Sequence, residues 1–238
     1  MGSEKDAVVQ YYDDIADTYD ESRFGNNYGK LIDTEERMIL DKLLSPGTGE
    51  KRLEIACGTG RLTNYATHGL DASGEMLRHA AARHRHVEWR QASGDDTGYE
   101  EEAFDVVYTF HLLMHLEPEV IRGIFREAHR ILKPGGRFIF DIPSKKRRRL
   151  FHHRQVSWHG GTELSRDDIV RLMGDDFSLG RSFGVMALPV HRLPNAVRRP
   201  LIRADYAVAN SAIKEYSSYI VYELIKGSTE NRFHHNSK

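Results

Sequence analysis

Apolar residues recur along this chain with two different periods, and the two periods alternate. Near the start, apolar positions every three to four residues predict helices over residues 5–22 and 31–44, the second ending at a Ser-Pro-Gly turn. The apolar positions of the first predicted helix are Val8, Val9, Tyr12, Ile15 and Tyr19. Helical periods of this kind predict one face turned toward a core and one toward water.

Further along, short apolar runs alternate with amphipathic stretches. Strands are predicted at "RLEIAC", "ATHGLD", "VEWRQ", "FDVVYTF", "RFIFDIP", "FSLGRSFGVMAL" and "YSSYIVYELIK". Helices are predicted at "GEMLRHAAARH", "EPEVIRGIFREAHRIL", "SRDDIVRLMG" and near residues 195–214, with a Lys-Pro-Gly-Gly stop after the second and an arrangement close to a capping box at Ser165 and Asp168. This alternation predicts an α/β fold with a ligand crevice at the switch point of its sheet.

Composition narrows the class of protein. The 238 residues fit one domain, or one domain with an elaboration, and 39% hydrophobic with 29% charged residues is ordinary for a globular protein. The single Cys57 allows no internal disulfide, which favours a reducing compartment, and we expect the cytoplasm. No apolar run approaches the ~18 residues of a membrane span, and the acidic N-terminus is unlike a signal peptide.

The net charge of -1 conceals an uneven distribution. Residues 1–22 carry seven acids against one lysine, whereas residues 144–203 carry thirteen Lys or Arg against five acids. Two interpretations stay open. The two regions are differently charged solvated faces, or the basic one forms a rim that attracts an anionic substrate.

The stretch "LEIACGTGRLTNYATHGLDAS", residues 53–73, carries the candidate chemistry: a buried strand, a Gly-x-Gly turn and then a carboxylate. Gly58 and Gly60 allow the backbone to approach a ligand closely. A dinucleotide fingerprint would have a third glycine where Thr63 stands, and an acid about 20 residues after the loop. Here Asp71 comes 11 residues after Gly60. At the end of the second strand it can accept from both hydroxyls of a ribose, and Glu54, near the end of the first strand, can meet a cationic group.

The stretches that carry a family resemblance are "YYDDIADTYD", "LEIACGTGRL", "LDASGEMLRHA", "FDVVYTFHLLMHL" and "REAHRILKPGGRFIFDIP". In these stretches the chain resembles the class I S-adenosylmethionine (SAM)-dependent methyltransferases, in their small-molecule branch of type 11 and 25. The resemblance implies a Rossmann-like seven-stranded sheet of order 3-2-1-4-5-7-6, with strand 7 antiparallel, helices on both faces and a small helical cap. It also implies an enzyme that transfers a methyl group from SAM to a small-molecule acceptor, anionic or amphiphilic, and releases S-adenosylhomocysteine.

The resemblance carries site residues over position by position. It assigns the methionine end of SAM to Glu54 and to the loop residues Ala56, Cys57, Gly58 and Gly60, with Ala56 where the family often has glycine. It assigns the ribose to Asp71, the adenine to Ala72, Met76, Ser93 and Gly94, and the surroundings of the methionine portion to Phe110. If the register shifts by two, Asp95 replaces Ser93 at the adenine edge.

The short spacing between Gly60 and Asp71 has a structural consequence. It lies close to the ~10–12-residue minimum for a crossover between parallel strands. We therefore expect a first helix of about one turn and a more open edge of the SAM pocket.

Catalytic residues are harder to predict than SAM-binding ones. His111 and His115 have the i, i+4 spacing of helical metal ligands, but the acid of a zincin motif is absent between them and no third ligand suggests itself, so we expect no metal. His115 is a candidate beside the transferred methyl, although packing is the commoner role at this family position. Tyr19 is a candidate lid residue over SAM, with a catalytic role as an alternative.

The basic run "SKKRRRLFHHR" reads as a solvated loop, or as a contact for a phosphate or carboxylate of the acceptor. Arg147, Arg148 and Arg192 are the substrate candidates. The histidine pairs at 152–153 and 234–235 are expected to be exposed.

The expected organisation is a helical lid over residues 1–30, a SAM-binding core over 31–143, the rest of the sheet over 144–227 with a substrate-cap insertion near 190–214, and a flexible tail over 228–238. Two other functions stay open: an RNA methyltransferase using the basic region, and a non-catalytic SAM-binding protein. The chain carries no appended RNA-binding module or Asn-Pro-Pro-Tyr-like motif. We thus expect a monomer or homodimer whose partner is a small molecule, with no DNA and with RNA disfavoured.

Overall fold

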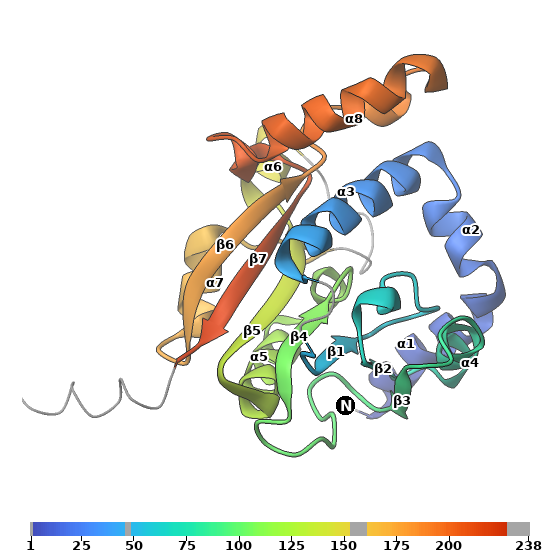
Figure 1. Ribbon diagram of the computed structural model, residues 1–238, viewed down its shortest axis with the longest axis vertical. Helices are drawn as coiled ribbons and strands as arrows, with labels where there is room; N and C mark the ends of the chain where they lie inside the picture. The colour runs from blue at the N-terminus through green and yellow to red at the C-terminus, as the bar shows by residue number, and fades with distance from the viewer. Residues whose placement is uncertain (1, 46–48, 153–160, 228–238) are drawn as a thin grey trace, which may run out of the picture.

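Seven strands form one mixed sheet in a computed structural model that describes residues 2–45, 49–152 and 161–227 (Figure 1). The order is β3-β2-β1-β4-β5-β7-β6, and β7 runs antiparallel to both of its neighbours. The strands are β1 (Arg52–Ile55), β2 (His68–Asp71), β3 (Glu88–Gln91), β4 (Phe104–Thr109), β5 (Leu132–Pro143), β6 (Phe177–Val185) and β7 (Tyr219–Lys226). The predicted fold class, strand order and antiparallel strand are confirmed.

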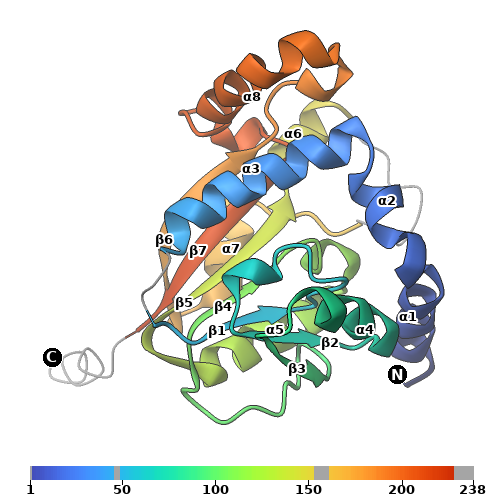
Figure 2. The ribbon, with the colours of Figure 1, turned by 45° about the vertical axis from the view of Figure 1, so that its right-hand side comes forward.

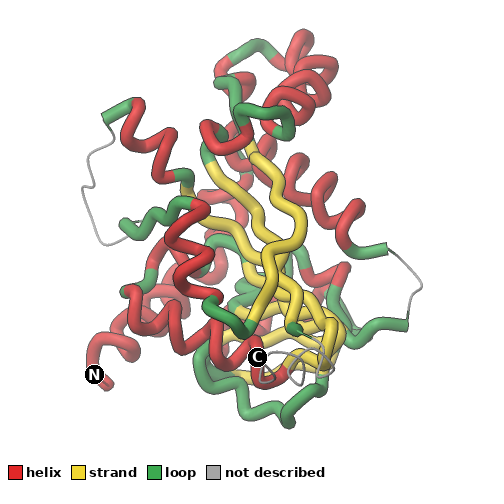
Figure 3. The backbone as a smooth tube through the Cα atoms, turned by 90° about the vertical axis from the view of Figure 1, so that its left-hand side faces the viewer, coloured by secondary structure: helices red, strands yellow, loops and turns green. Residues whose placement is uncertain are grey.

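Helices cover both faces of this sheet, as Figure 3 shows. They are α1 (Gly2–Ile15), α2 (Tyr19–Phe24), α3 (Asn27–Leu43), α4 (Gly74–Arg83), α5 (Pro118–Ile131), α6 (Lys145–Leu150), α7 (Arg166–Met173) and α8 (Asn195–Ala209). Short 3₁₀ turns are η1 (Ala16–Thr18), η2 (Thr63–Tyr65), η3 (Leu113–His115), η4 (Val190–Arg192) and η5 (Lys214–Tyr216). The helix predicted over residues 5–22 is therefore interrupted by η1.

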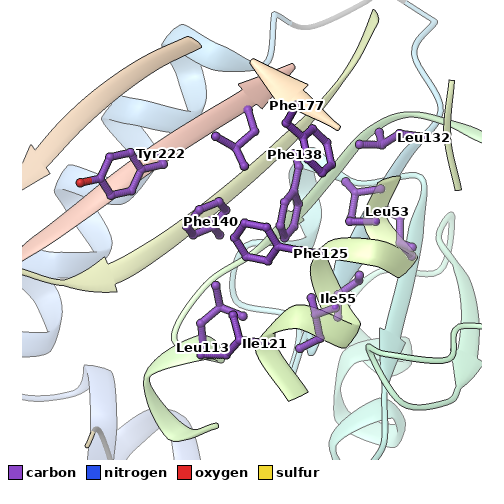
Figure 4. Close-up of a cluster of buried hydrophobic side chains, with 14 of the residues drawn as sticks. Leu53, Ile55, Leu113, Ile121, Phe125, Leu132, Phe138, Phe140, Phe177 and Tyr222 are labelled. Carbon is purple, nitrogen blue, oxygen red and sulfur yellow. The ribbon is translucent and has the colours of Figure 1, made fainter. Parts of the chain in front are cut away.

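Alternating side chains along the strands divide the core in two. On β5, Phe138 and Phe140 pack with α5 and α7, whereas Ile139 packs on the opposite face with α3. Figure 4 shows the first cluster, in which Phe125 of α5 lies between the strand phenylalanines. The same alternation turns Asp141 toward α3, and this polar position becomes important at the site.

The crossover from β1 to β2 contains only η2, so the expected truncation of the first helix is confirmed. The long helix α3 lies across it instead (Figure 2). Arg37 donates to the carbonyl of Arg61 at 2.5 Å, and the Tyr65 hydroxyl donates to Asp41 at 2.7 Å. α3 thus covers backbone that a longer crossover helix would shield.

Two local expectations were wrong. The basic run is not a loop, because Ser144 caps a helix there: its side chain accepts the N–H of Arg147, and residues 145–150 form α6. The Lys-Pro-Gly-Gly segment belongs to β5, which begins at Leu132 immediately after α5. The capping box at Ser165 and Asp168 is confirmed.

The expected domain boundary at residues 30/31 falls inside α3, and the tail 228–238 lies outside the described residues. Of the two histidine pairs, His152 is exposed and the other three residues also lie outside the description. Among the helices that the structure describes, none is long and apolar enough to cross a membrane.

Candidate functional site

The loop after β1 has the backbone of a ligand-binding turn. Ala56, Gly58 and Gly60 all have positive φ angles, of 53°, 54° and 83°. A Cβ on Gly60 would lie 3.0 Å from the ring of His84, whereas a Cβ on Gly58 would meet nothing within 4 Å. Gly60 is therefore a packing position, and Gly58 borders open space. Ala56 adopts a conformation in which glycine is the easier residue, which explains why the family often has glycine there.

Asp71 lies at the end of β2 and is joined to this loop. Its Oδ2 accepts the Gly58 N–H at 2.8 Å, and its Oδ1 accepts the Ser73 N–H at 2.9 Å. Burial raises the pKa of Asp71, although these N–H groups oppose the rise. Each carboxylate oxygen can accept another hydrogen bond, so a pair of adjacent hydroxyls would find two acceptors.

Glu54 is a buried carboxyl inside β1, with 4% of its surface exposed. The Thr63 hydroxyl donates to its Oε2 at 2.5 Å, and the Tyr108 hydroxyl lies 3.5 Å from the same oxygen. Burial raises the pKa of Glu54 to about 7. Thr63, the residue that replaces a third glycine, is thus a hydrogen-bond partner that the sequence did not reveal. A cationic ligand group here would favour the ionised form of Glu54.

The acidic N-terminal helices are fastened over this edge of the sheet. Asp13 of α1 accepts from the Ser73 hydroxyl at 2.5 Å and from the Glu75 N–H at 3.2 Å. Asp20 of α2 accepts from the Thr59 hydroxyl at 2.5 Å and also pairs with Arg83. Two of the acids in residues 1–22, Asp13 and Asp20, therefore contact α4 and the glycine loop.

Two tyrosines from these helices lie close to Asp71. Burial raises the pKa of Tyr12 and of Tyr19, and the carboxylate of Asp71 adds to both shifts. The ring of Tyr19 contacts the rings of Tyr12 at 6.2 Å and Phe24 at 6.3 Å. This arrangement supports the prediction of Tyr19 as a lid residue.

The expected adenine residues lie just before and in the first turn of α4 and in the loop after β3. The Ser93 hydroxyl donates to Asp95, so the two alternatives for the adenine edge form one hydrogen-bonded pair. A Cβ on Gly94 would lie 2.7 Å from Ile55 of β1, which requires glycine. The remaining assigned residues, which stay predictions, are Ala72 before α4, the buried Met76 in its first turn, the buried Cys57 and the buried Phe110 beside Tyr108.

A buried polar cluster lies where β4 and β5 end, and we call its three residues Glu36, His111 and Asp141 the triad. The Nε2 of His111 lies 2.8 Å from Glu36 Oε1, and its Nδ1 lies 3.4 Å from Asp141 Oδ2. The backbone N–H of His111 donates to Asp141 Oδ1 at 2.7 Å, and its φ is 57°. Glu36 and Asp141 are 0% and 2% exposed.

Charge compensation explains how the triad tolerates burial. Burial acts to lower the pKa of His111, but Glu36 and Asp141 outweigh it and raise that pKa. Arg61 donates to Glu36 at 2.7 Å and to Asp33 at 2.8 Å, so Glu36 stays ionised despite its burial. The three side chains also offer ligand atoms within 4.8 Å of one another, the spacing of a metal site. Because the two ring nitrogens face different carboxylates, however, the geometry favours a protonated imidazole.

The sequence analysis had singled out His115 rather than His111. His115 lies in η3, so the two histidines do not share one helix as their spacing had suggested. Glu36 and Asp141 were missed altogether. A signal was present in "DTEERMIL", where acids stand at core-facing positions between the apolar Ile32 and Ile39. Asp141 likewise interrupts the apolar run of β5.

The three predicted substrate arginines have different surroundings. Arg147 donates to the carbonyls of Ala187 and Tyr216, both at 2.9 Å, which gives its guanidinium a structural role. Arg148 lies 3.8 Å from the Glu163 carboxylate. Arg192, in η4, is exposed.

Comparison with known proteins shows a methyltransferase domain in this chain. A family model described as a methyltransferase domain matches residues 53–140. A demethylmenaquinone methyltransferase of Tropheryma whipplei is 29% identical over 150 residues, which cover 59% of this chain and 61% of that protein. The alignments cover 53% and 61% of the length of two curated relatives, so this chain spans little more than half of each.

Two solved structures share the fold. The first contains a methyltransferase in complex with the Haloferax volcanii Trm112 methyltransferase activator; its TM-score is 0.63 at 17% identity, covering 91% of this chain and 97% of that one. The second is the geranyl diphosphate C-methyltransferase of Streptomyces coelicolor with Mg²⁺, geranyl diphosphate and S-adenosylhomocysteine; its TM-score is 0.55 at 17% identity, covering 81% and 78%. Residues 53–140 thus match the methyltransferase domain, and the strand order of the whole sheet is that of the class I SAM-dependent methyltransferases that the sequence resembles.

Proposed function

We propose that this chain transfers a methyl group from SAM to a small-molecule acceptor that is amphiphilic or anionic. One observation carries the proposal: Asp71 and the Gly58 loop are joined by a 2.8 Å hydrogen bond beside open space at the carboxyl edge of the sheet. Ligands of open α/β sheets bind at this edge. The single buried Cys57 fits a cytoplasmic protein.

The residues present fit the chemical groups of SAM. Asp71 offers two oxygens to the ribose hydroxyls, and Glu54 offers a carboxyl that an ammonium group would ionise. The Ser93 and Asp95 pair offers an acceptor to the amino group of adenine. Tyr12 and Tyr19 of the N-terminal helices lie over the acid, where they can exclude water.

Bound SAM supplies a methyl group already activated by its sulfonium. The chain therefore has to position the acceptor in line with the sulfur, keep water out and accommodate charge. His111 can meet the last demand on the acceptor side. Glu36 and Asp141 stabilise its imidazolium form, so the neutral ring can receive a proton from the acceptor.

The surroundings of the triad indicate the character of the acceptor. The ring of His111 contacts the rings of Phe24 at 5.9 Å and Tyr219 at 5.5 Å. Aromatic walls beside a proton-accepting imidazole suit a molecule with an apolar body and a polar reacting group. The relative named for demethylmenaquinone methylation points in the same direction.

An acceptor screen tests the proposal. The protein is incubated with SAM labelled in its methyl group and with fractionated small molecules, and labelled products are separated by charge and polarity. We expect label in an amphiphilic or anionic fraction, and none with Asp71→Ala. A protein that binds SAM but labels no fraction would instead be a non-catalytic SAM-binding protein.

A further inference from the structure

Exposed large apolar side chains are concentrated at one end of the molecule. Among the side chains that the structure describes, ten such residues are exposed. Eight of them lie at residues 150–151 and 188–216, and a ninth, Tyr28, contacts the ring of His191 edge to face, with 5.2 Å between the ring centroids. Only Val170 on α7 lies apart. Scattered exposed hydrophobics are normal on a protein surface, but a concentration of this kind marks an interaction site.

The centre of this concentration is α8 with the segment that leads into it. We define the cap surface as Leu188, Leu193, Val197 and Leu201, which are 37–47% exposed. Val197, Leu201 and Ala204 follow one another at spacings of three to four residues, so they share one face of the helix, and Leu193 directly precedes its N-cap. The opposite face carries the buried Asp205, Tyr206 and Ala209. α8 thus turns an apolar face outward, at an end of the molecule that Figures 1 and 2 both show.

An apolar cavity of about 250 Å³ opens at the cap surface. Its lining contains no charged or polar side chain: Leu188, Pro189, Val190, Leu193, Leu201 and Ala204. Its volume lies below the range of typical cofactor pockets, which begins at about 300 Å³. The lining and the size suit part of a hydrocarbon chain.

Positive charge surrounds this apolar surface. Residues 186–216 contain five Lys or Arg and two acids, and one of those acids, Asp205, is fully buried. Arg192 and Arg203 are exposed beside the apolar stripe. The neighbouring α6 contains five consecutive basic residues, and Arg147 ties it to the cap through the carbonyls of Ala187 and Tyr216. An outward apolar face with basic neighbours is the composition of helices that lie in a membrane interface.

We propose that the cap surface binds the surface of an anionic lipid bilayer. The side chains of Leu193, Val197 and Leu201 enter the interface, and the arginines lie near lipid phosphates. Charge complementarity favours this occupant over a second copy of the chain. A two-fold dimer through the same stripe would bring Arg192 and Arg203 toward their own counterparts.

Binding of the cap surface to a bilayer would place the acceptor side of the site close to the lipid. This consequence rests on the proposed function. His191 of the cap contacts Tyr28, Tyr28 lies beside Tyr219, and Tyr219 contacts His111 of the triad at 5.5 Å. Arg198 of α8 donates to Asn27 at the start of α3 at 2.7 Å. The cap therefore connects the bilayer-facing surface with the triad, and an amphiphilic acceptor could be drawn from lipid rather than from water.

Vesicle binding by the full chain tests the proposal. The probe is vesicles of phosphatidylcholine alone or with about one third phosphatidylglycerol, separated from free protein by sedimentation. We expect binding to the anionic vesicles only, weakened by salt. The double variant Val197→Ser with Leu201→Ser should bind at least about tenfold more weakly, since two exposed apolar side chains are lost without disturbing the core. Val170→Ser, the exposed apolar residue on α7, is the matched control and should bind normally.

A charge series and a solution measurement complete the test. Arg192→Glu with Arg203→Glu should abolish binding to anionic vesicles, whereas Arg85→Glu, at an exposed position in the turn after α4, should not. Equal binding by the serine variants and the wild type overturns the proposal, and so does a dimer that these variants dissociate while no vesicles are bound. SAM affinity, measured by calorimetry in the same variants, should stay unchanged. Failure of the wild type to bind SAM would refute the proposed function while leaving the vesicle result to stand.

Discussion

The carboxyl group of Glu35 on α3 is hydrogen-bonded to that of Asp205 on α8. Both side chains are fully buried. Glu35 accepts the Met186 N–H at 2.7 Å and Asp205 accepts the Leu188 N–H at 2.6 Å, each through one oxygen. The remaining oxygens, Glu35 Oε1 and Asp205 Oδ2, have no other partner. Burial and the hydrogen bond to Asp205 raise the pKa of Glu35 to about 9, so Glu35 is the protonated member at neutral pH and helps to hold the cap on the body.

This pair predicts a loss of stability in alkaline solution. The folded pKa of Glu35 is raised, so its contribution is complete below the unfolded pKa of ~4.3 and is lost as pH rises through about 9. Between these two pKa values the free energy of unfolding should fall by about 1.4 kcal/mol per pH unit, and above about pH 9 this fall should level off. Glu35→Gln keeps a donor without the titration. Denaturation at pH 7 and pH 10 should show a smaller loss in this variant, and an equal loss would show that Glu35 does not titrate in this range.

Glu54 predicts how ligand affinity depends on pH. Because its pKa is raised to about 7, the carboxyl is protonated at pH 5 and ionised at pH 8. The ammonium group of S-adenosylhomocysteine should favour the ionised form, so affinity should rise between these values, by at most about tenfold per pH unit. Calorimetry checks this, with Glu54→Gln as the control that should bind more weakly and lose most of the slope. A flat profile in the wild type would place the ammonium group elsewhere.

His111 predicts a difference between SAM and its product. The sulfonium of SAM is a cation and S-adenosylhomocysteine lacks it, so only SAM should repel the proton of a nearby imidazolium. Calorimetry at pH 7 in buffers of different ionisation enthalpy should show more protons released by SAM than by S-adenosylhomocysteine. His111→Gln should remove the difference.

A metal in the triad is tested separately. If the triad holds a metal, dialysis against a chelator will lower SAM affinity and added Zn²⁺ or Mn²⁺ will restore it. We expect the chelator to have no effect.

The N-terminal helices should order further when SAM binds. Amide hydrogen exchange in residues 8–22 should slow on addition of SAM or S-adenosylhomocysteine. Asp20→Asn weakens the contacts with Thr59 and Arg83 and should reduce this protection. Asp14→Asn is the control, because Asp14 is exposed and accepts only from Gln10 on its own helix. Unchanged exchange in the wild type would make α1 and α2 fixed scaffold.

The periods of the sequence were enough to predict the sheet, since each strand that packs between helices has to be apolar. The β1–β2 crossover was also predictable, because chain length alone limits what fits between Gly60 and Asp71. α6 was missed since its cap, Ser144, stands before five basic residues whose charge suggested a solvated loop.

The site was only partly predictable for a physical reason. Asp71 and Gly58 are close in sequence and belong to one turn, so a local pattern reveals them. Glu36, His111 and Asp141 come from three separate elements, and only the packing of α3 on the ends of β4 and β5 brings them together. The role of Arg147 likewise depends on distant carbonyls of Ala187 and Tyr216.

The most direct test of the central claim is the affinity of SAM for the wild type and for Asp71→Ala, measured by titration calorimetry. A charge-assisted pair of hydrogen bonds to the ribose is lost in the variant, so binding should weaken by about 1–3 kcal/mol, or roughly 5- to 150-fold. Asp105→Ala is the control, because this acid lies in β4 and pairs with Lys133. Tight SAM binding by the wild type, weakened only by Asp71→Ala, is the predicted result. Equal SAM affinity in both proteins, or comparable binding of NADH by the wild type, would contradict the account.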